Sequence, residues 1–189
     1  MTYLIENKTF ERIDQTISAL ERAEYENCTF KNCSFYSADL SNFVFRSCIF
    51  DGCDLSLAAL KNTTLNDIQF TGCKLLGVKF HEANHFLLSF RFENCILSHS
   101  VFYRMKLKKT NFVNCKMEET DFTETDLTSS LLDNCDLYRA VFYNSILEKT
   151  DFRSAYNYSF DPERNRIKKA RFSRLGVTGL LEKYHIEIE

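Results

Sequence analysis

Eight cysteines are the residues of this 189-residue chain with the clearest capacity for chemistry, since thiols bind metals, form disulfides and act as nucleophiles. They form no Cys-x-x-Cys pair, and no histidine recurs near them at the spacing of metal ligands. Free cysteine commonly packs as a small buried apolar residue, so we expect reduced core cysteines, no metal and no cofactor. Six of them recur at steps of 20, 20, 22, 20 and 20 residues: Cys33, Cys53, Cys73, Cys95, Cys115 and Cys135.

A five-residue repeat underlies this spacing. Its centre is Phe or Leu almost throughout, and a small or apolar residue such as Cys28, Ala38 or Ser130 stands two positions earlier. Residues two apart on an extended segment point the same way, so both positions can face a core, whereas a helix would require 3.6-residue spacing. Two additional residues interrupt the repeat near residues 81–86, after which we expect it to resume with Leu87 as a core centre.

Four units make a twenty-residue step that places equivalent centres in columns. Neighbouring strands lie about 4.8 Å apart, so each column is predicted to run along a stack of coils. The residue before each of the six cysteines is Gly or Asn, the two residues that most readily accept positive φ, which predicts a repeated corner. A period this strict is typical of an all-β solenoid. One predicted column contains Phe30, Phe50, Phe70, Phe92 and Phe112.

The repeat divides the chain into three predicted parts. Residues 20–156 form the solenoid, with the two-residue slip near 81–86. Residues 1–19 form either an irregular first coil or a short helical cap, because their apolar residues fit both patterns. Residues 157–189 form a C-terminal cap or dimerisation segment, in which helical spacing predicts a small helix and the alternation at 185–189 is typical of a strand. The apolar candidates for capping or dimerisation are Val177, Leu180, Leu181, Tyr184, Ile186 and Ile188.

No catalytic or nucleotide-binding motif is present in the sequence. The histidines at positions 81, 85, 99 and 185 lack a paired nucleophile or carboxylate, and the five glycines form no phosphate-binding loop. The flat faces of a solenoid offer little of the concavity that a small-molecule site needs. We therefore expect a protein that is not an enzyme.

The sequence also contains no apolar run of 18 or more residues, and its first twenty residues carry several charges. These features predict neither a membrane span nor a signal peptide, and they favour a cytoplasmic location.

Charge is distributed unevenly along the chain. Residues 1–152 hold 16 Lys or Arg and 21 Asp or Glu. Residues 153–189 hold 8 Lys or Arg and 5 Asp or Glu. We interpret the basic excess as a solvated loop rather than a nucleic-acid site; it comprises Arg164, Arg166, Lys168, Lys169, Arg171 and Arg174. An acidic run at outward positions of adjacent units is the best candidate for contact with a partner, and it comprises Glu118, Glu119, Asp121, Glu124 and Asp126.

Two repeat units carry a family resemblance. Ser37–Ser41 (Ser-Ala-Asp-Leu-Ser) and Arg139–Phe142 resemble the A(D/N)LXX unit of the pentapeptide-repeat proteins. The resemblance covers roughly residues 20–156 and implies a right-handed quadrilateral β-helix with the Phe and Leu centres inside. The segment Asp161–Arg166 and the sequence Gly-Leu-Leu-Glu-Lys-Tyr at 179–184 are similar to the microcin-immunity branch of that family and, more distantly, to the Qnr quinolone-resistance proteins.

The resemblance implies a function. Members of that group protect DNA gyrase or topoisomerase IV from poisons, as rod-shaped, negatively charged imitations of DNA that dimerise through their C-terminal element. We therefore expect a topoisomerase partner, partial DNA mimicry and a homodimer, without direct binding of nucleic acid or membrane. The alternative is a general protein-interaction scaffold with an unrelated partner, which is favoured by aromatic residues at outward positions: Tyr36, Tyr103, Tyr138 and Tyr143.

Overall fold

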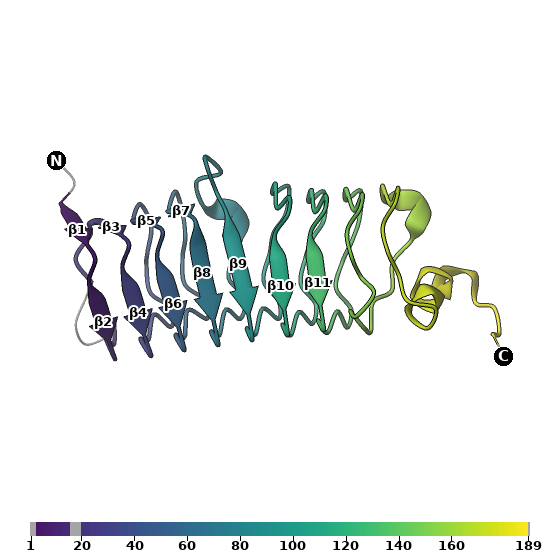
Figure 1. The fold of residues 1–189 in the computed structure, drawn as a ribbon, viewed down its shortest axis with the longest axis horizontal. Coiled ribbons are helices and arrows are strands. Elements are labelled where there is room, and N and C mark those ends of the chain that lie inside the picture. The colour runs from purple at the N-terminus through teal and green to yellow at the C-terminus, as the bar shows by residue number, and fades with distance from the viewer. Residues whose placement is uncertain (1–2, 16–19, 189) are drawn as a thin grey trace.

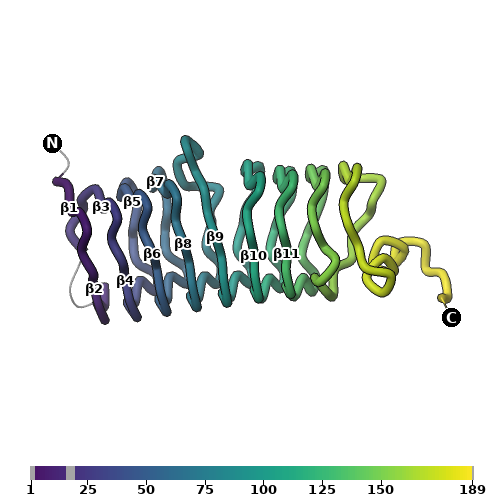
Figure 2. The backbone as a smooth tube through the Cα atoms, in the orientation of Figure 1, coloured from purple at the N-terminus to yellow at the C-terminus, as the bar shows by residue number. Residues whose placement is uncertain are grey.

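The twenty-residue step of the sequence is the register of a parallel β ladder. Phe10 pairs with Phe30, Phe30 with Phe50 and Phe50 with Phe70, each one coil further along. The computed structural model describes residues 3–15 and 20–188, which wind as stacked coils from one end of a rod to the other (Figure 1; Figure 2). The predicted all-β solenoid, a right-handed quadrilateral β-helix, is confirmed.

Two of the four faces of the rod are built from short strands. Face 1 contains a four-stranded sheet in the order β1-β3-β5-β7, and face 2 contains a seven-stranded sheet in the order β2-β4-β6-β8-β9-β10-β11. Most strands have three residues, because the chain turns a corner after each five-residue unit. The strands are β1 (Leu4–Glu6), β2 (Thr9–Glu11), β3 (Glu24–Glu26), β4 (Thr29–Lys31), β5 (Val44–Arg46), β6 (Ile49–Asp51), β7 (Thr64–Asn66), β8 (Ile68–Thr71), β9 (Phe90–Glu93), β10 (Asn111–Val113) and β11 (Leu131–Asp133).

Isolated parallel bridges form the other two faces and prolong the first two. Face 1 continues past its strands through the bridged residues Lys106, Asp126, Ile146 and Arg166, and face 2 continues through Asp151 and Arg171. Face 3 is defined by the bridged residues Ser34, Asp54, Lys74, Ile96, Lys116, Asp136 and Tyr156. Face 4 is defined by Asp39, Ala59, Lys79, Val101, Asp121 and Val141.

Most corners of the coils place one residue in the left-handed region of backbone conformation. The Gly or Asn before each of the six stacked cysteines has φ between 49° and 64°, as predicted. Ser, Asp, Leu, Arg, Lys, Glu or His adopts the same conformation at other corners, but among the described residues Val, Ile and Thr never do. The branched Cβ of those three residues clashes with the backbone at positive φ, so the corners exclude them.

Stacked aromatic rings form the centre of the core. The parallel rings of the column Phe30, Phe50, Phe70, Phe92 and Phe112 lie 4.8 to 5.2 Å apart between centroids, and all five side chains are buried. Stacking at this separation matches the spacing of the strands that carry the rings. All eight cysteines are free and buried, which confirms their predicted place in the core.

Small side chains two positions before the centres satisfy backbone carbonyls. Cys53 Sγ donates to Phe30 O at 3.2 Å, Thr63 Oγ1 donates to Leu40 O at 2.7 Å, and Ser145 Oγ donates to Phe122 O at 2.8 Å. In each case the acceptor lies 23 residues earlier, in the preceding coil. Buried polar groups cost free energy unless they are hydrogen-bonded, so this bond explains how Cys, Ser and Thr occupy a buried position.

The two additional residues of the slip form a protruding loop. Thr64 still pairs with Asn84 at a step of 20, but Ile68 pairs with Phe90 at a step of 22, so the extra residues lie between Asn84 and Phe90. The loop follows the 3-10 helix η1 (Phe80–Glu82) and projects beyond the neighbouring coils (Figure 1). The prediction that Leu87 is a core centre is wrong, because this residue turns outward with φ of 54° and is 65% exposed. Leu88 packs against the core instead.

The C-terminal segment is helical but not α-helical. It contains the 3-10 helices η2 (Pro162–Arg164), η3 (Gly176–Leu180) and η4 (Glu182–Tyr184). Gly179 lies so close to the last coil that a Cβ there would be 2.0 Å from the carbonyl oxygen of Tyr158. The predicted strand at 185–189 is absent from its described part, residues 185–188, since an alternating segment needs a neighbouring strand to complete its hydrogen bonds.

Truncation of a stacked ring should destabilise the rod. Phe112 is fully buried, and its ring lies 5.1 Å from that of Phe92, so Phe112→Ala should lower the free energy of unfolding by about 3–5 kcal/mol. Chemical denaturation measures this value. Tyr138→Ala, at a side chain that is 49% exposed, is the control and should cost less than about 1 kcal/mol. A loss below about 1 kcal/mol for Phe112→Ala would contradict the core assignment.

Alkaline pH should destabilise the fold through its buried thiols. Burial raises the pKa of Cys48 to about 12, so the folded chain keeps a proton that the unfolded chain loses near pH 9. The stability that this group contributes is complete below pH 9 and declines towards pH 12, with a slope of about 1.4 kcal/mol per pH unit. Urea denaturation across this range should show the decline. The decline in the free energy of unfolding should be smaller in Cys48→Ala. Equal slopes of free energy against pH in the two proteins would refute the assignment of the decline to Cys48.

Candidate interaction surfaces

The five acidic residues predicted to contact a partner lie on three consecutive faces of the rod, within residues 118–126. Glu118 and Glu119 follow the bridged Lys116 on face 3, Asp121 and Glu124 lie on face 4, and Asp126 begins face 1 of the next turn. The structure therefore brings them together as a belt around the rod and does not align them along its axis. Their neighbours along the axis are the residues twenty positions before and after, which include Lys106, His99 and Arg139.

Ion pairs neutralise most of this acidic belt. Arg104 Nε donates to Glu124 Oε2 at 2.7 Å, and this hydrogen bond lowers the pKa of the Glu124 carboxyl. Arg139 Nη1 lies 3.4 Å from Glu119 Oε1, and Lys108 Nζ lies 3.2 Å from Asp126 Oδ2. Glu118 pairs with Lys116 at 3.2 Å, and Asp121 Oδ1 accepts a hydrogen bond from Thr123 N at 2.8 Å. A basic partner would bind these carboxylates by displacing their present cations.

Tyrosine and arginine side chains form a second surface on faces 3 and 4. The guanidinium carbon of Arg104 lies 4.8 Å from the centroid of the Tyr103 ring, and that of Arg164 lies 5.4 Å from the Tyr143 ring. Tyr36, Tyr138 and Tyr143 are exposed as predicted, whereas Tyr103 is half-buried. Tyr and Arg are the residue types that dominate the binding energy of protein interfaces.

A groove of about 670 Å³ adjoins this surface. Tyr138, Val141 and Tyr143 line one side of it, while Tyr158 and Glu182 come from the last coil and the C-terminal segment. The sequence does not predict this groove, because the groove forms only where residues near 140 and 182 meet. No local pattern marks such a meeting, although the exposed tyrosines are visible at outward positions of the repeat.

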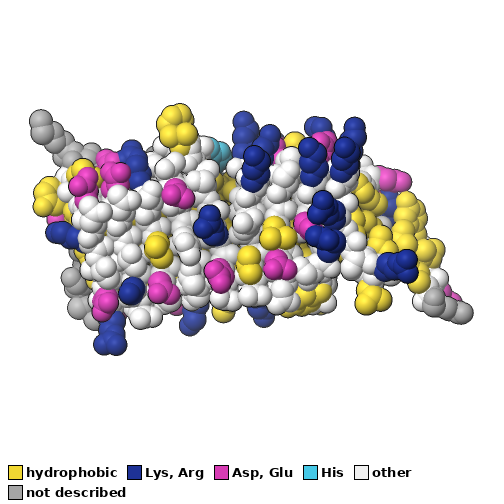
Figure 3. Space-filling view, viewed as in Figure 1, with side chains coloured by type: hydrophobic (Ala, Val, Ile, Leu, Met, Phe, Trp, Pro, Cys, Tyr) yellow, Lys and Arg dark blue, Asp and Glu magenta, His cyan; other side chains and the backbone are white. Residues whose placement is uncertain are grey.

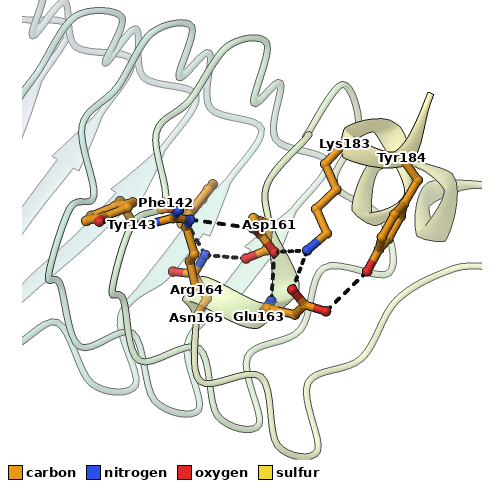
Figure 4. A network of polar contacts seen from close by, with 8 residues as sticks. All are labelled: Phe142, Tyr143, Asp161, Glu163, Arg164, Asn165, Lys183 and Tyr184. Carbon is orange, nitrogen blue, oxygen red and sulfur yellow. Dashed lines mark hydrogen bonds and ion pairs between the residues drawn. The ribbon is translucent and has the colours of Figure 1, made fainter.

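Lysine and carboxylate groups anchor the C-terminal segment to the rod (Figure 4). Lys183 Nζ donates to Asp161 Oδ1 at 2.6 Å and to Glu163 Oε2 at 2.8 Å, and Tyr184 OH donates to Glu163 Oε1 at 3.2 Å. Asn165 Nδ2 donates to Phe142 O at 3.0 Å, as the buried hydroxyls do in earlier coils. These bonds attach η4 to the segment around η2.

The six apolar candidates for capping or dimerisation divide into two groups. Leu180 is buried against the core, and Leu181 is half-buried. The remaining four are 40% to 56% exposed: Val177, Tyr184, Ile186 and Ile188. Leu175, which is 89% exposed, is a further apolar residue of this segment. The sequence pattern does not predict it, because Leu175 does not fit the helical spacing of the other candidates. The segment therefore covers the end of the rod with Leu180 and presents other apolar side chains to solvent.

The described residues contain no group of three or more His, Cys, Asp or Glu side chains arranged to hold a metal ion. His99 Nδ1 lies 3.4 Å from Glu119 Oε2, and His85 Nε2 lies 3.0 Å from His81 O in the protruding loop. Within residues 3–15 and 20–188, no helix is long and apolar enough to cross a membrane.

Comparison with solved structures finds similar rods. Two trypsin-treated variants of QnrB1, a plasmid-mediated fluoroquinolone resistance protein, are 19% and 20% identical to this chain, with TM-scores of 0.64 and 0.63. Each match covers 100% of this chain, with 98% and 100% of the respective QnrB1 chain. HetL, a pentapeptide repeat protein involved in heterocyst differentiation regulation in the cyanobacterium Nostoc, is 16% identical with a TM-score of 0.42, covering 89% of this chain and 84% of HetL. At these identities the likeness to the two QnrB1 variants concerns the fold alone.

Comparison of sequences points to the same family. No curated protein matches the chain by sequence. The model of the pentapeptide repeat region matches residues 22–91 and 85–156, which together make up well over half of the sequence. These segments contain the stacked coils and the corners described above, and the chain belongs to the pentapeptide repeat family.

Proposed function

We propose that this chain is a non-enzymatic cytoplasmic protein that binds DNA gyrase or topoisomerase IV and protects the enzyme from a poison. The observation that carries the proposal is the rod itself, whose likeness to QnrB1, a fluoroquinolone resistance protein, extends over the whole chain. The C-terminal sequence, which resembles the microcin-immunity branch, supports the same partner.

The charges of the rod support partial rather than complete mimicry of DNA. Duplex DNA carries one negative charge per about 1.7 Å, so a 30 Å length carries about 18. Residues 1–152, with 16 Lys or Arg and 21 Asp or Glu, have a net charge of only −5. The rod therefore carries much less negative charge than a duplex of that length. In this proposal the acidic belt of Glu118, Glu119, Asp121, Glu124 and Asp126 supplies the local contact, and basic groups of the enzyme replace Arg104, Lys108 and Arg139.

A second candidate function is a protein-interaction scaffold with an unrelated partner. The groove lined by Tyr138, Tyr143 and Glu182 favours it, because exposed tyrosines beside arginines offer contact area and hydrogen bonds without a large negative surface. In that case the acidic belt is a solvated surface of balanced charge.

We further propose that two copies associate through the C-terminal segment. Val177, Tyr184, Ile186 and Ile188 are exposed together at one end of the rod, and Ile186 and Ile188 line a hollow of about 250 Å³ with Leu181. Exposed apolar side chains gathered in one place favour association, since contact with a second copy removes them from water.

Supercoiling assays test the topoisomerase proposal. Purified protein titrated into bacterial gyrase, with and without a gyrase poison, should preserve supercoiling in the presence of the poison. Glu119→Lys with Glu124→Lys should raise the protecting concentration about tenfold, equivalent to about 1.4 kcal/mol of binding free energy. Asp51→Lys with Glu93→Lys, on face 2, is the matched control and should protect as the wild type does.

No effect on gyrase or topoisomerase IV, including enzymes from the native host, would overturn the topoisomerase proposal and favour the scaffold. An equal loss of protection in both charge-reversed double variants would show that the acidic belt does not contact the topoisomerase.

Light scattering coupled to size-exclusion chromatography tests the dimer. The wild type should elute at twice its chain mass of 22.2 kDa, and Ile186→Asp with Ile188→Asp should elute as a monomer, because two charges would be buried in the interface. Leu57→Asp with Leu76→Asp, at exposed apolar positions of face 3, is the control and should remain dimeric. A monomeric wild type would refute the proposal.

A further inference from the structure

Face 1 reverses its charge along the rod. Before the loop at residues 84–89, its outward positions carry four acids and one arginine: Glu6, Glu24, Glu26, Asp67 and Arg46. After the loop they carry two acids, Asp126 and Glu148, and seven basic residues: Lys106, Lys108, Lys109, Lys149, Arg166, Lys168 and Lys169. The sequence places Lys106–Lys109 and Arg166–Lys169 about sixty residues apart, but the ladder sets them on one surface.

Five of these seven cations have no acidic partner among the residues that the structure describes. Lys108 lies 3.2 Å from Asp126, and Arg166 Nη2 lies 2.7 Å from Glu148. In the described part of the chain, no ion pair involves the other five, all of which are exposed: Lys106, Lys109, Lys149, Lys168 and Lys169. Figure 3 shows Lys and Arg side chains gathered along the edge of the C-terminal half. The surface therefore carries a concentrated positive charge that the protein itself does not neutralise.

The unpaired lysines are spaced along the axis of the rod. Lys109, Lys149 and Lys169 occupy the same corner of face 1, each with φ of 59° to 61°. From Lys109 to Lys169 there are three coil steps, which span about 14 Å at the strand spacing. One strand of duplex DNA advances 3.4 Å per phosphate along its axis, so this span matches about four phosphates.

The chemistry of the surface favours a phosphate backbone over other anionic partners. No aromatic side chain occupies an outward position of face 1 between Lys106 and Lys169, so bases of a single strand find no stacking platform there. Lysine is depleted in protein–protein interfaces, which rely on Tyr, Trp and Arg. We infer that face 1 between Lys106 and Lys169 binds the phosphate backbone of duplex DNA without reading its sequence.

This inference goes beyond the proposed function and does not depend on it, since no topoisomerase takes part. It also departs from our sequence-based expectation that the chain does not bind nucleic acid, because that expectation treated the C-terminal basic cluster apart from Lys106, Lys109 and Lys149.

Fluorescence anisotropy with a labelled DNA duplex of about 20 base pairs tests the inference. Contacts from five lysines should give a slope of about −4.5 for the logarithm of the binding constant against that of the salt concentration. Affinity should then fall about 500-fold between 50 and 200 mM salt. Replacing Lys109, Lys149 and Lys169 by Gln should reduce that fall to about tenfold, with a slope near −1.8.

A second triple variant separates this surface from net charge. Lys31, Lys61 and Lys74 are exposed, lie on faces 2, 4 and 3, and have no ion pair within residues 3–15 and 20–188. Their replacement by Gln removes the same charge and should leave the slope near −4.5. Equal effects of the two triple variants would overturn the inference. Tighter binding to poly-glutamate than to the duplex at equal salt would also overturn it, by identifying an acidic polypeptide as the preferred ligand.

Discussion

Parallel hydrogen bonding between coils is the constraint on which the rest of the structure depends. It pairs residues that are twenty positions apart, as Phe10 with Phe30 and Phe30 with Phe50, or twenty-two positions apart across the loop. The same register stacks the rings of the core and aligns the buried thiols and hydroxyls with carbonyls of the preceding coil. Each coil thus covers the apolar edge of its neighbour, which no five-residue unit could do alone. The terminal coils lack a neighbouring coil on one side, and Leu180 covers part of the apolar edge at the C-terminal end.

The ladder also determines which charges meet on the surface. Arg104 reaches Glu124, and Arg139 reaches Glu119, because residues twenty apart are neighbours along the axis. Acids that are consecutive in the sequence instead spread around the rod over three faces. This arrangement pairs most carboxylates of the acidic belt with cations, and it leaves the C-terminal half of face 1 basic. The same rod therefore presents surfaces of opposite sign at different places.

These surfaces are distributed over the faces and the C-terminal end of the rod, and the acidic belt and the tyrosine surface share Arg104. The acidic belt and the tyrosine surface lie mainly on faces 3 and 4, and the unpaired lysines lie on face 1. The apolar residues proposed for association lie at the C-terminal end, where Lys183 holds their segment to Asp161 and Glu163. Because the core columns lie beneath all of them, substitutions of these outward side chains should leave the core intact.

The sequence by itself determined the repeat, the core columns, the buried cysteines and the corners. Each depends on a short unit that meets the same environment in every coil, so a local pattern is sufficient to predict it. Only the tertiary structure decided the outward turn of Leu87, because two extra residues can be accommodated inside or outside the core. It also decided the alignment of Lys109, Lys149 and Lys169, which requires the register to be followed over sixty residues of chain. The 3-10 helices of the C-terminal segment depend on contacts that occur only once, such as Gly179 against Tyr158. No repeating sequence pattern predicts such contacts.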